Sequence, residues 1–501
     1  MSIAGVLGPA LAEDPDRTAL VAPDLTLSYA ELDAAAAQAA GALRELGVRP
    51  GMRIGVGLPN DSRMVVLFHA AMRLGAVWVG ISQQLAPPEQ AALLDHCGAS
   101  LTIGVAGPLP DAGLPHAERG QAGRPGPGRV LALRPAEWAD AVRAAGPVGP
   151  VPVDPGAPAA IAYTSGTTGQ PKGVVHSQHN LLVPGAVLVA TRGYDSSLRK
   201  ADSLPMTILN LLVLSTLLTS QARGTAVISD ARRAQEVVRW LRETRATVWN
   251  GVPALLYDMA RDPAIAASAL DGLIEVWSGG DNLSEEIRAA FCNRFSPSLT
   301  GTYGLTEAPT VVAIEDRGEP HRPGCSGPVL PHLSVREDPG GELCVGGRAD
   351  GPWAGLYTPM LGYLNAPEET AQALHDGVLR TGDVGRVNER GEVFVTDRRK
   401  LVIVRGGANV YPAEVERIIA GYRGVRACAV FGTPDERLGA RITAVVQAQD
   451  TGLDLDGLRL HCRERLARYK VPEDWRVTTD ALPRNAMGKL DRPAIAARHV
   501  I

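Results

Sequence analysis

The chain carries one dense stretch of hydroxyl, glycine and lysine residues, which reads Tyr163-Thr164-Ser165-Gly166-Thr167-Thr168-Gly169-Gln170-Pro171-Lys172-Gly173. It follows directly on the small apolar run Ala159-Ala160-Ile161-Ala162. A short strand that leads into a glycine-rich loop presents backbone N–H groups and hydroxyls to an anion. The stretch therefore predicts a strand followed by a loop that binds a polyphosphate.

Two common phosphate-binding fingerprints do not fit this loop. Counted from Gly166, a Walker A loop needs its second glycine where Pro171 stands, and Lys172 is followed by Gly173 instead of Ser or Thr. The G-x-G-x-x-G pattern of dinucleotide-binding folds is also missing from the sequence. A surface turn rich in Ser, Thr and Gly is the structural alternative. The density of hydrogen-bond donors favours phosphate contact.

Length and composition describe a globular protein of several domains. At 501 residues the chain exceeds what one hydrophobic core supports, and a prior of about 150 residues per domain predicts roughly two to four domains or subdomains. The net charge is −4, with 50 basic and 54 acidic residues interspersed along the chain. Because no basic patch or stripe is visible in the sequence, we expect no nucleic-acid partner.

Cysteine usage and the first residues predict a cytoplasmic protein. The six cysteines are scattered without a C-x-x-C pair, so neither a metal cluster nor a disulfide framework is expected. The start of the chain is acidic, at Glu13, Asp14 and Asp16, where an export signal would be basic and apolar.

The segment 203–222 requires a membrane check, because it carries no charged residue and contains many leucines. It is long enough to span a bilayer, which takes about 20 apolar residues. Pro205, Asn210 and Gln221 interrupt its apolar side chains. We therefore expect a buried helix beside a ligand pocket and no transmembrane segment.

Helical and strand patterns alternate along the first hundred residues. Ser28 and Glu31 form a capping box, which predicts that a helix begins after Ser28. Segments 51–57 and 76–81 are predicted as strands, with a helix at 61–74 between them. Such alternation is typical of an α/β fold with a parallel sheet and crossover helices. Further on, the same patterns predict helices at 136–145 and 234–244 and strands at 247–249 and 274–277.

Lysine is rare in this chain. Only five of the 50 basic residues are lysines, at positions 172, 200, 400, 470 and 489. The lysine ammonium is a compact point charge that a planar guanidinium does not replace. In an arginine-rich chain, the lysines that remain are therefore candidates for functional sites.

Two further clusters combine glycine with residues suited to a nucleotide. In Gly301-Thr302-Tyr303-Gly304-Leu305-Thr306-Glu307, an aromatic ring between glycines can stack on a base, and Thr306 and Glu307 offer hard oxygen ligands to Mg²⁺. In Arg380-Thr381-Gly382-Asp383, the carboxylate is placed where it can accept both hydroxyls of a ribose. Gly-Asp is also a common turn, and that alternative stays open.

Three stretches near the C-terminus complete the pattern: Asp397-Arg398-Arg399-Lys400, Arg405-Gly406-Gly407-Ala408-Asn409-Val410-Tyr411-Pro412-Ala413-Glu414-Val415-Glu416 and Pro483-Arg484-Asn485-Ala486-Met487-Gly488-Lys489-Leu490-Asp491-Arg492. Together with the clusters above, and in this order, they make the chain resemble the adenylate-forming (ANL) superfamily. That superfamily includes acyl-CoA synthetases, adenylation domains and luciferase-like enzymes. The resemblance extends over essentially the whole chain.

The resemblance implies an α/β fold in two domains. Residues 1–399 would form a large N-terminal domain of several subdomains, with parallel and mixed sheets and helices. Residues 400–501 would form a small, mobile α+β domain that swings on a hinge at Lys400. In one arrangement such enzymes join a carboxylic acid to ATP, giving acyl-AMP and pyrophosphate. After rotation of the small domain they pass the acyl group to a thiol.

The motifs imply an ATP site residue by residue. Tyr303 would pack on the adenine, and Asp383 and Arg398 would hold the ribose side. The ATP-binding residues implied by the resemblance are Thr164, Ser165, Gly166, Thr167, Thr168, Gly169, Gly280, Thr302, Tyr303, Gly304, Asp383 and Arg398.

The implied catalytic residues are Lys489, Thr306 and Lys172, and Glu307 would hold Mg²⁺. A carboxylate that attacks the α-phosphate brings two anions together, so catalysis requires cations that neutralise the developing charge. By resemblance, Lys489 would bridge the carboxylate and the α-phosphate. A lone lysine beside glycine is usually solvated, and only the surrounding Pro-Arg…Gly-Lys…Asp-Arg pattern supports this role.

The implied acyl pocket departs from the superfamily pattern. Ile208 stands where many relatives have the histidine of a Pro-x-x-His stretch, and Leu209 stands where enzymes for 2-hydroxybenzoic acids have asparagine, so a salicylate-like acid is not expected. A buried Asp281 would need a substrate amine or hydroxyl as partner, or else it caps the helix that starts near Ser284. The pocket residues implied are Ile208, Leu209, Asn250, Gly251, Gly279, Asp281, Gly301 and Ala308.

For the transfer step, Gly406 and Gly407 would keep the backbone slim along the path of a pantetheine arm, because only glycine permits so close an approach. Lys470, in Tyr469-Lys470-Val471-Pro472, also matches a superfamily position. CoA ligases and carrier-loading enzymes share this pattern, so it does not choose between them.

Three functions fit these motifs. The leading one is an acyl- or aryl-CoA synthetase that uses ATP, Mg²⁺ and CoA on a small carboxylic acid. The alternative is a stand-alone adenylating enzyme that loads a phosphopantetheinyl acyl carrier protein or an amine. A luciferase-like monooxygenase or a non-catalytic relative is less favoured, because the chain ends without a peroxisomal Ser-Lys-Leu signal and keeps Lys489. The identity of the acid and the choice between a monomer and a homodimer stay open.

Overall fold

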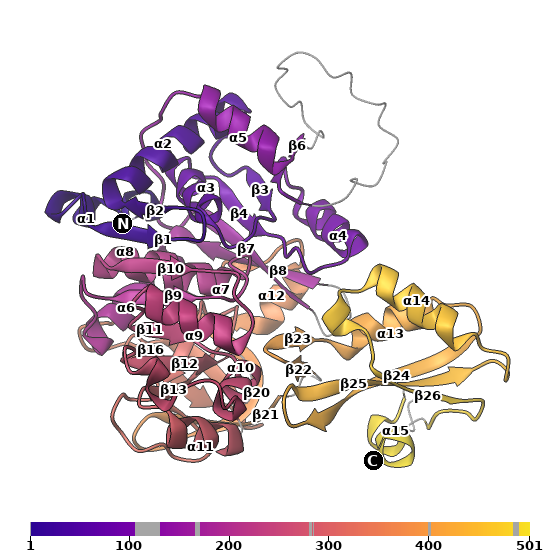
Figure 1. The fold of residues 1–501 in the computed structure, drawn as a ribbon. Helices are drawn as coiled ribbons and strands as arrows, with labels where there is room; N and C mark the ends of the chain where they lie inside the picture. The colour runs from indigo at the N-terminus through magenta and orange to yellow at the C-terminus, as the bar shows by residue number, and fades with distance from the viewer. Residues whose placement is uncertain are drawn as a thin grey trace, which may run out of the picture.

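The computed structural model describes residues 2–105, 131–165, 171–279, 283, 285–398, 402–483 and 490–500. Figure 1 shows a large N-terminal part, residues 2–398, and a small C-terminal part, residues 402–500, that lies against one side of it. Within these ranges, three sheets with their covering helices build the N-terminal part.

The first sheet runs in the order β18-β8-β7-β4-β3-β5-β6. Its strands pair in parallel from β7 to β6, and β8 adds antiparallel to β7. The strands are β3 (Arg53–Val56), β4 (Val77–Gly80), β5 (Leu101–Ile103), β6 (Leu131–Leu133), β7 (Pro158–Ser165), β8 (Pro171–Ser177) and β18 (Gly362–Tyr363). Helices in this region are α2 (Tyr29–Glu45), α3 (Ser62–Arg73), α4 (Pro87–Cys97) and α5 (Pro135–Ala144). Phe68 of α3 packs edge-to-face on Trp78 of β4, and both are fully buried.

The second sheet runs in the order β14-β13-β12-β11-β9-β10-β1-β2 and is parallel between β13 and β1. Its strands are β1 (Thr18–Val21), β2 (Thr26–Ser28), β9 (Arg199–Asp202), β10 (Thr225–Ile228), β11 (Val248–Asn250), β12 (Glu275–Gly279), β13 (Ser298–Gly304) and β14 (Val311–Ile314). The helices and turns of this region are η1 (Ile3–Gly5), α1 (Gly8–Glu13), α6 (Gln178–Arg192), α9 (Ala234–Glu243), α10 (Pro253–Arg261), η3 (Ala267–Leu270) and α11 (Glu285–Arg294).

The third sheet of the N-terminal part is antiparallel. It contains β15 (Cys325–Pro328), β16 (Leu333–Glu337), β17 (Glu342–Gly347), β19 (Leu374–His375), β20 (Val378–Val387) and β21 (Glu392–Arg398), and α12 (Pro367–Ala373) precedes β19.

The C-terminal part is a small α+β unit with its own core. It contains the hairpin β22 (Ile403–Arg405) and β23 (Ala408–Val410), the sheet β24 (Val425–Asp435), β25 (Gly439–Ala448) and β26 (Asp474–Thr478), the helices α13 (Pro412–Ala420), α14 (Leu455–Arg465) and α15 (Arg492–His499), and η4 (Arg468–Lys470). Val415, Ile419, Val430, Ile442 and Leu458 are fully buried in one cluster. Figure 1 shows α13 and α14 on one face of the sheet and α15 on the other.

The predicted α/β class, with a large N-terminal part of parallel and mixed sheets and a small α+β C-terminal part, is confirmed. The capping box forms as expected, because the Ser28 hydroxyl accepts from Glu31 N and the Glu31 carboxylate accepts from Ser28 N. The predicted helix at 61–74 is α3, which Asp61 caps. The predicted strands at 247–249 and 274–277 correspond to β11 and β12.

The uncharged segment 203–222 is helical only from Leu209 onward, as α7 (Leu209–Leu212), a π-helical stretch η2 (Val213–Leu217) and α8 (Leu218–Ala222). Residues 203–208 stay extended or turned because Asn60 binds their backbone: its amide donates to Leu204 O at 2.8 Å and accepts from Met206 N at 2.9 Å. Within the described ranges, no helix has the length and apolarity needed to cross a bilayer.

Candidate active site

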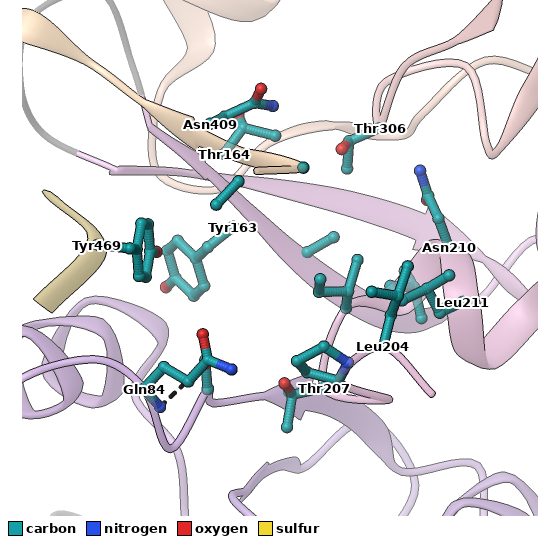
Figure 2. Close-up of a pocket in the computed structure, with 18 of the residues that line it drawn as sticks. Gln84, Tyr163, Thr164, Leu204, Thr207, Asn210, Leu211, Thr306, Asn409 and Tyr469 are labelled. Carbon is teal, nitrogen blue, oxygen red and sulfur yellow. Dashed lines mark hydrogen bonds between the residues drawn. The ribbon is translucent and has the colours of Figure 1, made fainter. Parts of the chain in front are cut away.

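A cavity of about 930 Å³ lies between the N-terminal and C-terminal parts, and we call it the central cavity. Four neighbouring parallel strands, β9, β11, β12 and β13, end at it. They deliver Ser203, Asn250, Gly279 and Thr302 to its wall. The carboxyl ends of parallel strands are the usual place for a ligand in open α/β sheets. Figure 2 shows side chains that line this cavity.

The predicted phosphate loop begins at one wall of the central cavity. Thr164 at the end of β7 and Lys172 at the start of β8 are register partners across the hairpin, and both line the cavity. Gly166, Thr167, Thr168 and Gly169 lie outside the described residues. The described residues Thr164 and Lys172 on both sides of these four therefore lie at the cavity wall.

Thr306, Glu307 and Lys172 line the same cavity, and Glu307 and Lys172 both contact Tyr363. The Lys172 ammonium lies 5.0 Å from the ring centroid of Tyr363, and the Tyr363 hydroxyl donates to Glu307 Oε1 at 2.8 Å. Burial and the Glu307 carboxylate raise the pKa of Tyr363, so this phenol keeps its proton and acts as a donor. The carboxylate predicted to hold a cation is thus oriented beside the lysine predicted to hold phosphate.

The predicted nucleoside residues gather around Asp383 on β20. Its Oδ2 accepts from the buried Tyr303 hydroxyl at 2.8 Å, and Arg398 lies opposite it in register on β21. Asp383, Thr302 and Gly304 line the central cavity, whereas the Tyr303 ring is buried behind the wall. Its predicted stacking on adenine stays a prediction.

The end of the cavity where the acyl group is predicted to bind has largely apolar lining residues, and we call this lining the acyl wall. Figure 2 shows Leu204, Thr207, Asn210 and Leu211 grouped there, from the loop and the helix that follow β9. The predicted pocket residues Ile208, Leu209, Asn250, Gly251 and Gly279 also line the cavity. Gly279 must lack a side chain because a Cβ would collide with the Thr302 hydroxyl. Gly301 and Ala308 lie outside this lining, and Ala308 lines a separate small cavity beside α6.

A buried ion pair lies directly behind the acyl wall. Lys200 and Asp202 on β9 are fully buried and 3.2 Å apart (Nζ to Oδ2), and the ammonium lies 4.9 Å from the ring centroid of Trp277. Asp202 also accepts from the Ser215 hydroxyl and from Nδ2 of Asn250. Because a carboxylate only accepts, the nitrogen of the Asn250 amide must face Asp202, and its oxygen is left for another donor.

The sequence pointed to Lys200 only through the rarity of lysine, and it gave no indication of Asp202. The one available signal is that two opposite charges occur two residues apart in a strand that ends in a ligand cavity. Residues two apart in a strand share a face, which is why the pair meets.

Asp202→Asn should lower the free energy of unfolding by about 3–5 kcal/mol, because it removes the carboxylate that pairs directly with the buried Lys200 ammonium. Burial lowers the pKa of Lys200, so the folded state releases this proton more easily than the unfolded chain does. The loss should therefore shrink as pH rises toward the ordinary lysine value of 10.5. Urea unfolding at several pH values measures this loss, and Asp262→Asn, at a partly exposed carboxylate, is the control. Equal losses in both variants would contradict the expectation.

The predicted thiol path enters the central cavity from the C-terminal part. Gly406 and Gly407 form the turn between β22 and β23, with φ of 56° and 83°, and both line the cavity. A Cβ on Gly407 would lie 2.7 Å from Cγ1 of Val252 in the N-terminal part. The two parts thus meet at this turn, and a side chain there would force them apart.

The whole chain matches known proteins. A family model described as AMP-binding enzyme matches residues 9–355, and one described as AMP-binding enzyme C-terminal domain matches residues 414–489. The chain is an AMP-binding enzyme. The predicted membership of the adenylate-forming superfamily and the predicted class, an AMP-forming ligase of the acyl-CoA synthetase type, are thereby confirmed.

Relatives of this AMP-binding enzyme include long-chain-fatty-acid–CoA ligase FadD13 of Mycobacterium tuberculosis, which is 32% identical over 93% of this chain and 92% of its own length. Feruloyl-CoA synthase of an Amycolatopsis species is 34% identical over 97% of this chain and 96% of its own length. The solved structure of amide bond synthetase McbA from Marinactinospora thermotolerans has a TM-score of 0.83 and 26% identity, and covers 99% of both chains.

Membership of this AMP-forming family implies ATP and CoA as co-substrates. Several predicted residues of the AMP-binding enzyme fall outside the described ranges: Gly280, Asp281, Lys400 and Lys489. Their roles stay predictions. The neighbours of Lys489 that are described, Pro483 and Leu490, do not line the central cavity.

Proposed function

We propose that this enzyme activates a small carboxylic acid with ATP and transfers the acyl group to CoA. The carboxylate oxygen attacks the α-phosphorus, the bond to pyrophosphate breaks, and acyl-AMP forms. The CoA thiolate then attacks the acyl carbon and AMP leaves with the C–O bond electrons. The supporting observation is that the central cavity joins the predicted ATP residues Lys172, Thr306 and Asp383 to the glycine turn Gly406-Gly407.

A cation such as Mg²⁺ fits this site. Glu307 and Thr306 supply oxygen ligands at the cavity wall, and Tyr363 orients the Glu307 carboxylate. In the described part of the chain, no group of three or more His, Cys, Asp or Glu side chains could hold a metal by itself. The ion would therefore share phosphate oxygens and water with few protein ligands, as Mg²⁺ commonly does at phosphate sites, where it neutralises charge.

We further propose that residues 1–399 and 400–501 are separate domains and that the second rotates about Lys400. The support is the separate apolar core of the C-terminal part and the position of its glycine turn in the cavity. We also propose that the enzyme is cytoplasmic. The support is that its six cysteines form no disulfide and that five of them are buried.

The acyl wall supports an acid with an apolar body that carries one hydrogen-bond donor. Leu204, Leu211 and Trp277 offer apolar surface, and the amide oxygen of Asn250 is left to accept from a hydroxyl or an N–H group. A carrier-protein thiol or an amine is the second candidate acceptor. The similarity to an amide bond synthetase over 99% of the chain supports an amine as this second candidate.

Pyrophosphate release across fatty, aromatic and amino acids, each with and without CoA, tests the proposal. The aromatic acids are run in pairs that differ by one hydroxyl group. We expect release with one acid class, acceleration by CoA and a thioester product. Release without thioester would move the acceptor to a carrier protein or an amine, and no release with any acid would contradict the proposed activity.

A further inference from the structure

A buried ion-pair cluster joins the N-terminal and C-terminal parts beside the central cavity. Glu89 of α4 accepts from Lys470 Nζ at 2.7 Å, and Lys470 Nζ also donates to Glu414 Oε1 of α13 at 2.8 Å. Glu89 Oε2 accepts from the backbone N–H of Ala467 at 2.8 Å. The side chains of Glu89, Lys470 and Glu414 are 12%, 7% and 5% exposed. A single carboxylate of the N-terminal part thus receives two donors from the C-terminal part.

The Glu89 carboxylate is held in place by its own helix. It accepts from Ala86 N at 2.7 Å at the start of α4, where Pro87 occupies the first turn. This contact belongs to the N-terminal part alone, so the carboxylate is oriented independently of the C-terminal part. A pre-oriented partner loses little conformational entropy when a contact forms.

Lys470 remains charged in this setting. Burial by itself would lower the pKa of Lys470, but Glu414, Tyr469 and Glu89 together raise it above the ordinary value. Burial and the neighbouring carboxylate of Glu89 raise the pKa of Glu414. The Lys470–Glu414 pair lies wholly within the C-terminal part, so the contribution of Glu89 is the one that depends on how the two parts are placed.

Two other ion pairs between the parts are more exposed. Arg437 binds Asp258 with side chains 52% and 31% exposed, and Arg261 binds Glu436 with side chains 57% and 68% exposed. Exposed pairs contribute about 0–1 kcal/mol because water screens them and the long side chains lose entropy. Among the described residues, the Glu89–Lys470 contact is therefore the strongest ionic determinant of the arrangement.

This arrangement suits acyl transfer. Glu89, Tyr469 and Lys470 line the central cavity together with Gly406 and Gly407, and Figure 2 shows Tyr469 on the same side as Tyr163. On the other face of the C-terminal sheet, Leu482 and Ile495 pack against Ala429 and Val445. None of the described residues in 471–483 and 490–500, which flank Lys489 on both sides, lines the cavity.

We propose that Glu89 is a positioning residue for the transfer step: by receiving Lys470 and Ala467 N, its carboxylate stabilises the arrangement in which Gly406 and Gly407 face the acyl-AMP cavity. This role rests on the proposed function, because slower acyl transfer can be observed only if the enzyme transfers an acyl group. In the adenylation arrangement, where Lys489 must reach the cavity, the C-terminal part leaves Glu89. The Glu89 carboxylate then keeps only its contact with Ala86 N and has no role in placing the C-terminal part.

Glu89→Gln tests the role with little disturbance of the fold. Glutamine can still accept from Ala86 N, as it does in capping boxes, and Lys470 keeps Glu414. We expect transfer of preformed acyl-AMP to CoA to slow by about tenfold, in line with the loss of a charge-assisted hydrogen bond. Pyrophosphate exchange and the melting temperature should be unchanged. The matched control, Glu436→Gln, removes the exposed pair and should leave both half-reactions unchanged.

A distance measurement makes the test independent of activity. Cys292 is exposed on the N-terminal part and Leu460 is 55% exposed on α14, so dyes on Cys292 and on Leu460→Cys report the arrangement by energy transfer. Glu89→Gln should lower the population of the present arrangement, and Glu436→Gln should not. An unchanged population, or equal slowing of both half-reactions, would overturn the role of Glu89. If wild type transfers no acyl group but the population still shifts, the proposed function fails, whereas the part of the proposal that Glu89 holds the C-terminal part in the present arrangement stands.

Discussion

Lys489→Ala should slow acyl-AMP formation by about 10²–10³-fold, the loss expected when one preorganised cation is removed from a developing negative charge. ATP binding should change little, because the phosphate-loop residues lie in the N-terminal part. Transfer from preformed acyl-AMP should also persist, because the described neighbours of Lys489 lie away from the central cavity in the present arrangement. Pyrophosphate exchange, ATP titration and single-turnover transfer measure the three steps separately.

The control for this variant is Arg498→Ala, which removes a different positive charge from α15 in the same part of the enzyme. The other lysine in residues 402–500, Lys470, is unsuitable because it is buried in the ion-pair cluster. It should leave all three measurements unchanged. Unchanged pyrophosphate exchange in Lys489→Ala would remove the assignment of this lysine as a catalytic residue.

Gly407→Trp should have the opposite effect: acyl transfer falls by about 100-fold or more, and acyl-AMP formation is spared. A side chain at this turn meets Val252 and fills the predicted thiol path, and misplacement of reacting groups by about 1 Å already costs this much. Acyl-AMP should therefore accumulate in the enzyme when CoA is present. Quantification of bound acyl-AMP after a single turnover checks this.

Backbone strain needs its own control, because Gly407 has a φ of 83°, which side chains rarely adopt. Gly391 has a φ of 74°, and a Cβ there would meet no atom within 4 Å. Gly391→Trp thus carries similar strain outside the cavity and should leave transfer intact. If Gly407→Trp reduces both half-reactions equally, the glycine turn is structural and does not form the thiol path.

Local patterns in the sequence were sufficient for much of the fold. The capping box at Ser28 and the N-cap at Asp61 depend on residues two or three positions apart, so they can be recognised in the sequence alone. The sequence predicted a helix over 203–222, whereas residues 203–208 form a loop. This loop could not be recognised locally, because the residue that binds its backbone, Asn60, is far away in the chain.

In the candidate site too, some residues could be recognised from motifs, whereas others depend on residues that are distant in the chain. The resemblance to the adenylate-forming superfamily implied one shared site for the motifs of Thr164, Thr306 and Gly407, and these residues line the same cavity. The contact between Glu89 and Lys470 joins residues 381 positions apart, and no local pattern marks Glu89 as anything but a helix-capping residue. Asp202 was missed for a similar reason, since its meaning depends on Asn250 and Ser215 from other elements.

The separate core of the C-terminal part has a consequence for solubility during turnover. Its large apolar residues, such as Val415 and Ile442, are buried against one another and not against the N-terminal part. Its contacts with that part include ion pairs, which water can replace on both sides. If the C-terminal part rotates as we propose, this core therefore stays covered, and the rotation does not expose these buried residues to aggregation.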